Sequence, residues 1–262
     1  MKKISLIALV AIFIILTGCS SARRTEKKVS DMQTAQAHMR IGMRFLDNGD
    51  FGQALKELKQ AYQGIKNDPV LVNAIGLAYK GLKDFKSAED YFRDALKLEP
   101  GFFDTHNNLG VLYAETGQYD KAKSHFVEVL KNKAYPTPEL AHYNLALIFI
   151  KENKKDLAIS ELQKSVEIAP DFLYSYLQLG LLYKDTKRYN DSLDIFQRAL
   201  AIQPDIPQFI YNIAQVYELK NNRPAAVENY KKALNSPDCP EDLARAIRQR
   251  LINLEGIETL VE

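Results

Sequence analysis

The sequence has few of the residues that build catalytic or metal sites. Among its 262 residues are two cysteines, four histidines and no tryptophan. Two cysteines cannot form a disulfide framework. No Gly-x-Ser-x-Gly, His-Glu-x-x-His, glycine-rich phosphate loop or paired-cysteine motif occurs. We therefore expect a protein that is not an enzyme and that needs no metal, cofactor or small-molecule substrate.

Glycine and proline are also scarce, with 12 and 10 residues, and 46% of the chain is apolar. This composition argues against global disorder and suits one large domain or a repeat array. The formal charge is +2, but Lys2 and Lys3 lie in a segment that we expect to be removed, which leaves 33 basic and 33 acidic residues. Because a near-neutral chain lacks the basic surface that nucleic acids require, no nucleic-acid partner is expected.

The longest apolar run lies near the N-terminus. Residues 4–16 are apolar except for Ser5, follow two lysines and lead into Leu-Thr-Gly-Cys, which ends at Cys19. A helix that crosses a membrane needs about 20 apolar residues. The shorter run, with its positive flank, predicts a secretion signal at residues 1–18 in preference to a transmembrane span.

The Leu-x-Gly-Cys ending resembles the bacterial lipobox, in which the cysteine accepts diacylglycerol and is then N-acylated. This resemblance implies a lipid anchor at Cys19, although an ordinary signal peptide could also end in cysteine. Each buried methylene contributes about 0.8 kcal/mol, so three acyl chains would hold the protein permanently. Ser20, in place of Asp, implies sorting to the outer membrane, facing the periplasm. Residues 19–34 would be the lipidated cysteine and a short polar tether.

Comparison of the chain with itself reveals a period of 34 residues. Small residues recur at spacings of 34, 34, 36, 34 and 34: Gly42, Gly76, Gly110, Ala146, Gly180 and Ala214. Three positions after each lies an aromatic residue: Phe45, Tyr79, Tyr113, Phe149, Tyr183 and Tyr217. Twelve positions after each lies another small residue: Ala54, Ala88, Ala122, Ala158, Ser192 and Ala226. These columns predict six repeats over residues 35–238.

Each repeat carries a helical apolar stripe in each half, with a polar turn between them, and this pattern predicts paired helices in an all-α fold. Small residues in the columns allow the two helices to approach to about 8–10 Å. The repeats are predicted to begin at Ala35, Pro69, Phe103, Glu139, Leu173 and Pro207. Residues 239–262 should form a helix that caps the stack. Its apolar face would contain Leu243, Ala246, Ile247, Leu251 and Leu254.

The second repeat carries the pattern Leu-Gly-x-x-Tyr, Ala, Phe, Ala and Pro almost completely, as Ile75, Gly76, Tyr79, Ala88, Phe92, Ala95 and Pro100. This pattern resembles the tetratricopeptide repeat (TPR) family. The resemblance implies a right-handed superhelix, or α-solenoid, in which the first helices of successive repeats line a concave groove that binds a protein segment.

Positions in the first helices predict which side chains face this groove. Amides there can hydrogen-bond to an extended peptide backbone, and tyrosines offer a flat apolar area with a polar tip. Some of these side chains could instead complete the packing between neighbouring helices, Leu147 in particular. The predicted groove residues are Asn73, Asn107, Asn108, Val111, Tyr143, Asn144, Leu147, Tyr174, Leu177, Gln178, Tyr211 and Asn212.

The histidines could serve either in helix packing or as metal ligands. His38, His106 and His142 share the fourth place of their repeats, where TPR proteins usually have Trp, and this predicts a packing role. A zinc site would require them to converge, yet each belongs to a different layer. His125 is predicted to be alone and solvated. Cys239 lies in a predicted loop and is either a tolerated free thiol or the site of an intermolecular disulfide.

The layout of signal, tether, six repeats and capping helix resembles the PilF/PilW family of type IV pilus biogenesis. The 36-residue spacing before Ala146 reflects an insertion with Tyr135-Pro136, and that family has Tyr-Pro at this junction. The resemblance implies a pilotin, an outer-membrane lipoprotein that binds secretin subunits and promotes their insertion and multimerisation. The alternatives are a periplasmic adaptor that recruits cell-wall hydrolases or another envelope complex, and an enzyme or its accessory domain.

Overall fold

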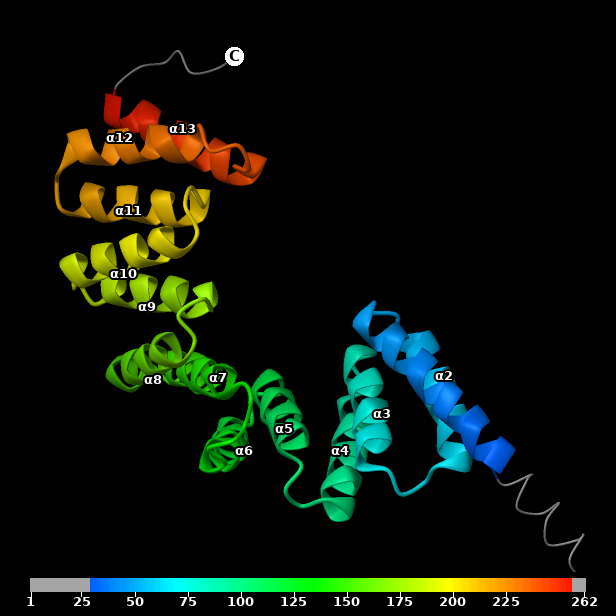
Figure 1. Ribbon diagram of the computed structural model, residues 1–262. Helices are drawn as coiled ribbons and strands as arrows, with labels where there is room; N and C mark the ends of the chain where they lie inside the picture. Colours follow the sequence, from blue (N-terminus) through cyan, green and yellow to red (C-terminus); the bar gives the residue numbers. More distant parts are fainter. Residues whose placement is uncertain (1–28, 256–262) are drawn as a thin grey trace, which may run out of the picture. The chain divides into compact units, whose positions relative to one another are not determined.

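The computed structural model describes residues 29–255, and all regular secondary structure in that range is helical (Figure 1). The all-α fold is therefore confirmed. The chain divides into two compact units, one ending at His125 and the other beginning at Phe126. We describe each unit by itself. Helix α6 (Tyr119–Lys131) contains the boundary between them.

The first unit consists of antiparallel helices joined by short turns. In it, α3 packs against α2, α4 and α5. Its helices are residues 29–47, α2 (Phe51–Gly64), α3 (Pro69–Gly81), α4 (Phe85–Leu98) and α5 (Phe103–Glu115).

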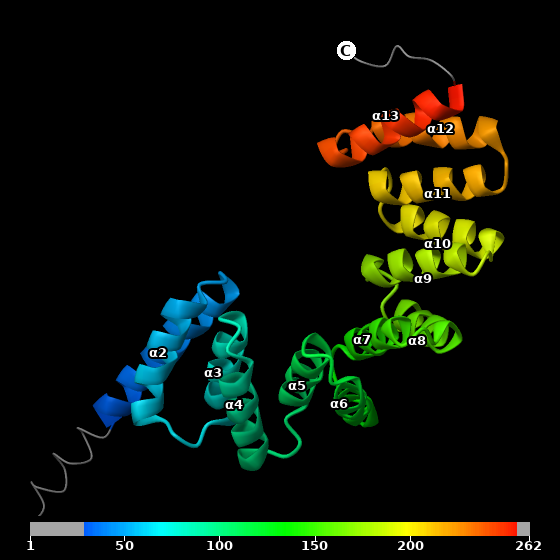
Figure 2. The same ribbon diagram turned by 180° about the vertical axis from the view of Figure 1, so that it is seen from behind.

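The second unit stacks three helix pairs and a final helix in layers, and the view from behind shows the same order (Figure 2). Each helix packs against the next, and the first helices α9 and α11 also touch each other. The helices are α7 (Pro138–Lys151), α8 (Lys155–Ile168), α9 (Leu173–Asp185), α10 (Tyr189–Ile202), α11 (Pro207–Leu219), α12 (Arg223–Leu234) and α13 (Glu241–Glu255).

The predicted repeat starts at Pro69, Phe103, Leu173 and Pro207 coincide with helix starts, and the start predicted at Glu139 lies one residue inside α7. The first repeat differs. Its helix begins at residue 29, so residues 29–34 are not part of a non-helical tether. Neither glycine nor proline interrupts this stretch, and Ala35 is buried next to Gly64 at the end of α2.

Glycines in the first helix of a repeat allow its second helix to pack closely. A Cβ placed on Gly76 would lie 2.6 Å from the ring of Phe92, and one on Gly180 would lie 2.3 Å from the ring of Phe196. Both rings are fully buried. Since real Cβ atoms do not approach other atoms so closely, each glycine is required by the aromatic residue sixteen positions later.

The turn inside every repeat contains one residue with a left-handed backbone. These residues follow the same spacing as the repeat: Gly49, Lys83, Gly117, Asn153, Lys187 and Asn221. The amide of the next residue donates to the carbonyl of the residue in the aromatic column, as from Asp84 to Tyr79 and from Arg188 to Tyr183. This hydrogen bond satisfies a carbonyl that the helix end would leave unpaired. Two of the six turns use glycine and two use asparagine, which tolerates this conformation, whereas Lys83 and Lys187 bear a conformational cost of about 1 kcal/mol.

The insertion before α7 brings a side chain into the second unit. Tyr135 is buried, and the amide of Ala134 is held by the side chain of Asn132 at 3.0 Å. Pro138 then occupies the first turn of α7, where its missing N–H has no cost. The insertion is thus an ordered loop in which Tyr135 contributes to the core.

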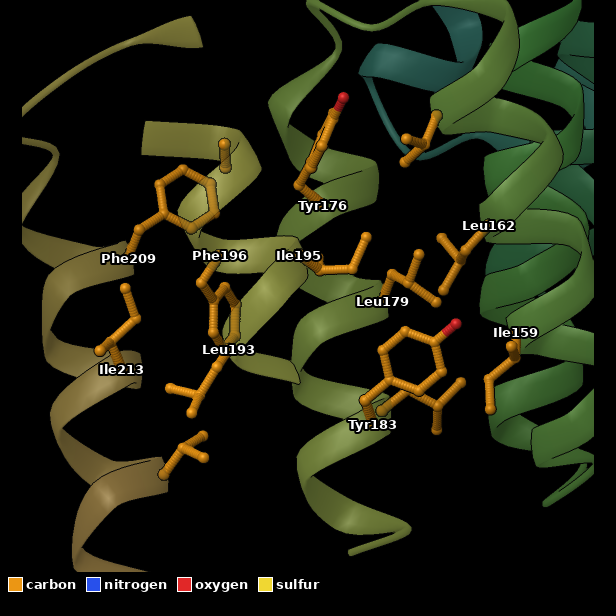
Figure 3. Packing of buried hydrophobic residues seen from close by; sticks show 14 of the residues in the cluster. Ile159, Leu162, Tyr176, Leu179, Tyr183, Leu193, Ile195, Phe196, Phe209 and Ile213 are labelled. Carbon is orange, nitrogen blue, oxygen red and sulfur yellow. The ribbon is translucent and has the colours of Figure 1, made fainter. Parts of the chain in front are cut away.

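The core of the second unit contains two clusters, and both include residues of α11. Figure 3 shows Leu162, Tyr183 and Phe196 among the side chains that fill the space between neighbouring helices. Helix α13 covers α12 with Ala244, Ile247 and Leu251 buried. The predicted face was wrong at Ala246, which is exposed, because the buried stripe passes through Ala244 instead.

Candidate functional site

The predicted groove residues lie on the first helices of their repeats. Those of the first unit lie on α3 and α5, and those of the second unit lie on α7, α9 and α11. Their surroundings differ sharply between the two units.

In the first unit two of the three predicted amides, Asn73 and Asn108, bond to each other. Asn73 is only 7% exposed, and its side-chain oxygen accepts hydrogen bonds from the Thr105 hydroxyl and from the Asn108 amide, both at 3.0 Å. Val111 is half-buried nearby on α5. The Asn107 side-chain oxygen is buried and has no hydrogen-bond partner among the described residues. Asn73 and Asn108 therefore hold α3 and α5 together, which leaves less of them to meet a ligand.

A charged pair extends this polar network. Lys80 on α3 contacts Glu115 on α5 through an Nζ–Oε1 distance of 3.2 Å. Both residues lie toward the C-terminal ends of their helices. Across α3 and α5 the polar side chains are thus largely engaged with each other.

In the second unit, aromatic rings lie at and beside the predicted groove positions, and one of them is largely exposed. Tyr143 on α7 meets the ring of Phe172 edge-on, with 5.4 Å between ring centroids. Phe172 in turn lies 5.5 Å from Tyr174, which is 66% exposed. Burial raises the pKa of Tyr143, with a smaller effect from Tyr174, so its hydroxyl stays neutral and can donate a hydrogen bond. Three rings from α7, α9 and the turn between repeats form one apolar surface.

This surface leads into a pocket of about 450 Å³ between α9 and α11. Two predicted groove residues, Tyr174 and Leu177, line it. The full lining is Asp171, Phe172, Leu173, Tyr174, Leu177, Gln203, Ile206, Gln208 and Phe209. Phe172 and Phe209 were not among the predicted groove residues. A signal existed for the first, because Phe102, Phe172 and Ile206 put an apolar residue just before the first helix of three repeats.

Lys184 provides a cation on the same face of α9. Its Nζ donates to the side-chain oxygens of Asn212, at 3.0 Å, and Gln215, at 2.6 Å. The Gln215 amide donates in turn to the Tyr211 hydroxyl at 2.7 Å. Burial lowers the pKa of Lys184. Lys184 was not predicted as a groove residue, because the predicted positions all lie nearer the N-terminus of the first helix.

The remaining groove residues are less exposed than predicted. Asn212 is 1% exposed and also donates to the Gln208 carbonyl at 2.7 Å, so its amide organises α11 and Lys184. Asn144, Leu147 and Gln178 are half-buried. Their part in binding stays a prediction.

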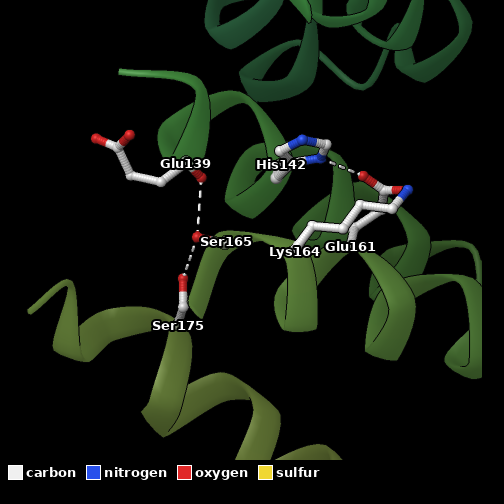
Figure 4. Close-up of polar contacts among 6 residues, drawn as sticks. All are labelled: Glu139, His142, Glu161, Lys164, Ser165 and Ser175. Carbon is white, nitrogen blue, oxygen red and sulfur yellow. Dashed lines mark hydrogen bonds and ion pairs between the residues drawn. The ribbon is translucent and has the colours of Figure 1, made fainter. Parts of the chain in front are cut away.

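The histidines pair with the residue nineteen positions later instead of only filling space. His38 lies 2.6 Å from Glu57, and His142 lies 2.6 Å from Glu161, which also receives Lys164 (Figure 4). Burial alone would raise the pKa of Glu161, but the hydrogen bonds from His142 and Lys164 outweigh it, so the pKa is lowered. Within residues 29–255 no three His, Cys, Asp or Glu side chains converge as metal ligands would.

The prediction that His125 is alone and solvated was wrong. Its Nδ1 lies 3.0 Å from Nδ1 of His106, and its ring stacks on Tyr113 at 5.5 Å. The repeat register explains this, because position 125 is nineteen after His106, where Glu57 and Glu161 stand in other repeats.

A second polar chain ties the layers together behind the groove. Ser165 on α8 shares a buried hydrogen bond of 2.7 Å with Ser175 on α9 and donates to the Glu139 carbonyl at 3.0 Å (Figure 4). Both serines are fully buried. These bonds fix α9 against the preceding repeat and thereby position Tyr174.

Only one of the two cysteines, Cys239, lies among the described residues. Cys239 is half-buried beside the cluster that includes Ile247, and burial raises the pKa of its thiol. A raised pKa makes it a poor nucleophile, which favours the free-thiol reading. Cys19 and the signal lie outside the described residues. Among the helices of residues 29–255, none has the length and apolarity that a bilayer span requires.

Two family models described as tetratricopeptide repeat match the chain. One matches residues 91–124 and the other matches 71–102, 140–172, 173–206 and 207–236. Together they account for more than half of the sequence, with three matches that begin within one residue of predicted repeat starts. The chain belongs to the tetratricopeptide repeat family.

Solved TPR structures share this fold over most of its length. PilW, a widely conserved type IV pilus biogenesis factor, matches with a TM-score of 0.70 and 19% identity over 82% of this chain and 99% of PilW. PilF of Pseudomonas aeruginosa matches with a TM-score of 0.69 and 16% identity over 84% and 99%. YrrB, a TPR protein with an unusual peptide-binding site, matches with a TM-score of 0.56 and 22% identity over 73% and 97%. The similarity to PilF and PilW predicted from the sequence is confirmed at the level of the fold.

Two curated relatives are much longer proteins. Human protein O-mannosyl-transferase TMTC3 is 26% identical over 204 residues, which are 72% of this chain and 22% of the transferase. Bovine BBSome complex member BBS4 is 23% identical over 203 residues, which are 77% of this chain and 38% of that protein. This TPR chain spans about a fifth of the transferase and about two fifths of BBS4.

Proposed function

We propose that this protein is a pilotin, a lipid-anchored outer-membrane scaffold that binds secretin subunits in type IV pilus biogenesis. The observation that carries the proposal is the likeness to PilW and PilF, which covers 99% of both of those chains. The lipobox at Cys19 and the Tyr135-Pro136 insertion support it from the sequence.

The mechanism is tethering. The acylated Cys19 keeps the repeats at the outer membrane, and the groove holds a segment of the secretin subunit. Binding to an anchored scaffold raises the local concentration of subunits at the bilayer, so that multimerisation there becomes faster without any new contact between subunits.

The protein works by binding and not by catalysis. The open part of the groove offers aromatic rings, amides and one ammonium group, and the chemistry of this set is recognition of a peptide. TMTC3 carries a transferase name, but this chain spans only 22% of it and matches the TPR models instead.

Deletion of the gene tests the proposal. We expect loss of heat-stable secretin multimers and of surface pili, with restoration by the wild-type gene. Normal multimers and normal pili in the deletion strain would contradict the pilotin function and leave the TPR scaffold without its proposed partner.

The anchor is tested separately by Cys19→Ala. We expect a folded protein that moves from the membrane fraction to the soluble periplasmic fraction, with fewer secretin multimers at the outer membrane. A matched Cys239→Ala variant should remain at the membrane, because its thiol takes no part in anchoring. Continued membrane attachment of Cys19→Ala would favour a transmembrane segment over a lipid anchor.

A further inference from the structure

The groove between α9 and α11 carries two different recognition features. At the N-terminal ends of these helices lies the apolar pocket that Tyr174, Leu177 and Phe209 line. Two to three turns further along α9 lies Lys184, at the same side of the helix because positions 174, 177, 181 and 184 recur with helical spacing. Its contacts on α11, Asn212 and Gln215, show that it also lies between the two helices.

The charge of Lys184 is uncompensated. Among residues 29–255 its Nζ is paired with two amide oxygens, which accept its hydrogen bonds but carry no negative charge. Burial lowers its pKa, and no carboxylate acts in the opposite direction. Lys80 is the residue at the same place of the second repeat, and it has Glu115 at 3.2 Å. Lys184 is therefore a half-buried cation that is held in position and still lacks an anion.

We propose that this groove binds an extended peptide segment in which an acidic side chain follows or precedes an apolar side chain by four positions. The apolar side chain enters the pocket at Tyr174 and Leu177, and the carboxylate pairs with Lys184. This inference rests on the proposed function, since it describes the segment that the partner would present.

The spacing follows from the geometry of helix and strand. An α-helix rises 1.5 Å per residue, so Lys184 lies about 10 Å beyond Leu177 and about 15 Å beyond Tyr174 along α9. An extended chain rises about 3.3 Å per residue, and side chains four positions apart point to the same side at about 13 Å. A spacing of two would fall short of Lys184, and a spacing of six would pass it.

Fluorescence anisotropy with labelled twelve-residue peptides tests this directly. The full chain is purified in detergent and titrated with a serine-rich peptide that carries Phe and, four positions later, Glu. The matched peptide has Gln in place of Glu. Both peptides are also made with the order of the two residues reversed. We expect at least one Glu peptide to bind about tenfold more tightly than its Gln counterpart, and this difference should shrink in high salt. A Phe→Ala peptide should also bind weakly.

Variants of the protein assign the effect to Lys184. Lys184→Met keeps the apolar stem, and we expect it to abolish the difference between the Glu and Gln peptides, whereas Lys184→Arg should retain it. Lys80→Met removes the ion-paired lysine at the same repeat position and should change nothing. Equal binding of Glu and Gln peptides by the wild-type protein, or an equal loss in the Lys80 and Lys184 variants, would overturn the inference.

The same variants separate this inference from the proposed function. If Lys184→Met loses peptide discrimination but leaves secretin multimers normal in cells, the chemistry of the groove stands and the secretin assignment of this groove fails. If the wild-type protein does not distinguish the peptides while the deletion strain lacks multimers, the pilotin function stands and this inference fails.

Discussion

The first helices α3 and α5 and the first helices α9 and α11 have the same length and the same place in their repeats, yet their polar side chains have different uses. Each of the four has 13 residues. Across α3 and α5, Asn73 and Lys80 are taken up by partners within the protein. Across α9 and α11, the ring of Tyr174 is exposed, and Lys184 has no acidic partner within the part of the chain that the structure describes. Repeat position thus fixes where a side chain stands, and the neighbouring repeat decides whether it remains available.

The largest expected effect is on stability, and it tests the close packing of glycine against phenylalanine that the two regions share. Gly76→Ala and Gly180→Ala each place a methyl group inside a buried phenylalanine ring, so both should lower the free energy of unfolding by about 2 kcal/mol. Chemical denaturation followed by circular dichroism measures this. Ala146→Gly, at the same repeat position and in the same core cluster as Leu162, is the control: it cannot overpack and should lose only about 1 kcal/mol through helix propensity. A loss in only one region would show that the two regions pack by different rules.

The next effect tests what separates them. Tyr174→Ala should weaken binding of the peptide that carries Phe and Glu about tenfold, because an exposed aromatic side chain of the groove is lost. It should change the free energy of unfolding by less than about 0.5 kcal/mol. Val70→Ala, at the same place in the second repeat and 41% exposed, should leave binding unchanged. Anisotropy titrations of both variants measure the difference. Similar losses in the two variants would mean that the groove binds along both regions.

The hydrogen-bond network that joins α3 and α5 can be tested at Thr105. Thr105→Val removes a buried hydroxyl that donates to Asn73 and should destabilise the protein by about 1 kcal/mol. Thr105→Ser keeps the hydroxyl and should lose less. If the denaturation midpoints of both variants equal that of the wild type, the network around Asn73 does not hold α3 and α5 together.

The smallest effect concerns the turns that both regions use. Lys83→Gly and Lys187→Gly relieve a left-handed lysine at the end of a first helix, so each should gain about 0.5–1 kcal/mol of stability. Gly117→Lys should lose a similar amount. Thermal unfolding of the three variants compares the two regions, and a loss of stability in Lys83→Gly or Lys187→Gly would show that the lysine side chain contributes more than the backbone cost.

Period and column residues were enough to predict the helix pairs. Gly76 and Gly180 are informative because only a close helix contact requires glycine within a helix. The extent of the first helix was not predictable from the columns, since residues 29–34 precede the first repeat and carry no periodic pattern. Ala244 and Ala246 are equally apolar, and only the docking angle of α13 decides which of them is buried.

The groove was less predictable, for a physical reason. Register placed Tyr174 and Leu177 correctly at the pocket, because that depends on helical geometry alone. Whether the Asn73 side chain is free to bind a ligand depends on its hydrogen bond with Thr105, which lies 32 residues later in another repeat. Lys80 and Lys184 occupy the same repeat position and differ in whether an acidic residue lies opposite them. A comparison of residue types at one repeat position does not show this difference.

The uniform turns have a consequence for engineering. The fifth repeat begins at Leu173 and the sixth at Pro207. The helices of the fifth repeat, α9 and α10, pack against α8 before them and α11 after them. A duplicated segment of residues 173–206 would therefore enter the stack in register, as one more copy of a 34-residue module. The length of the peptide that this surface would bind is then a quantity that can be set in whole modules, each adding one more copy of Tyr174 and Lys184 to the groove.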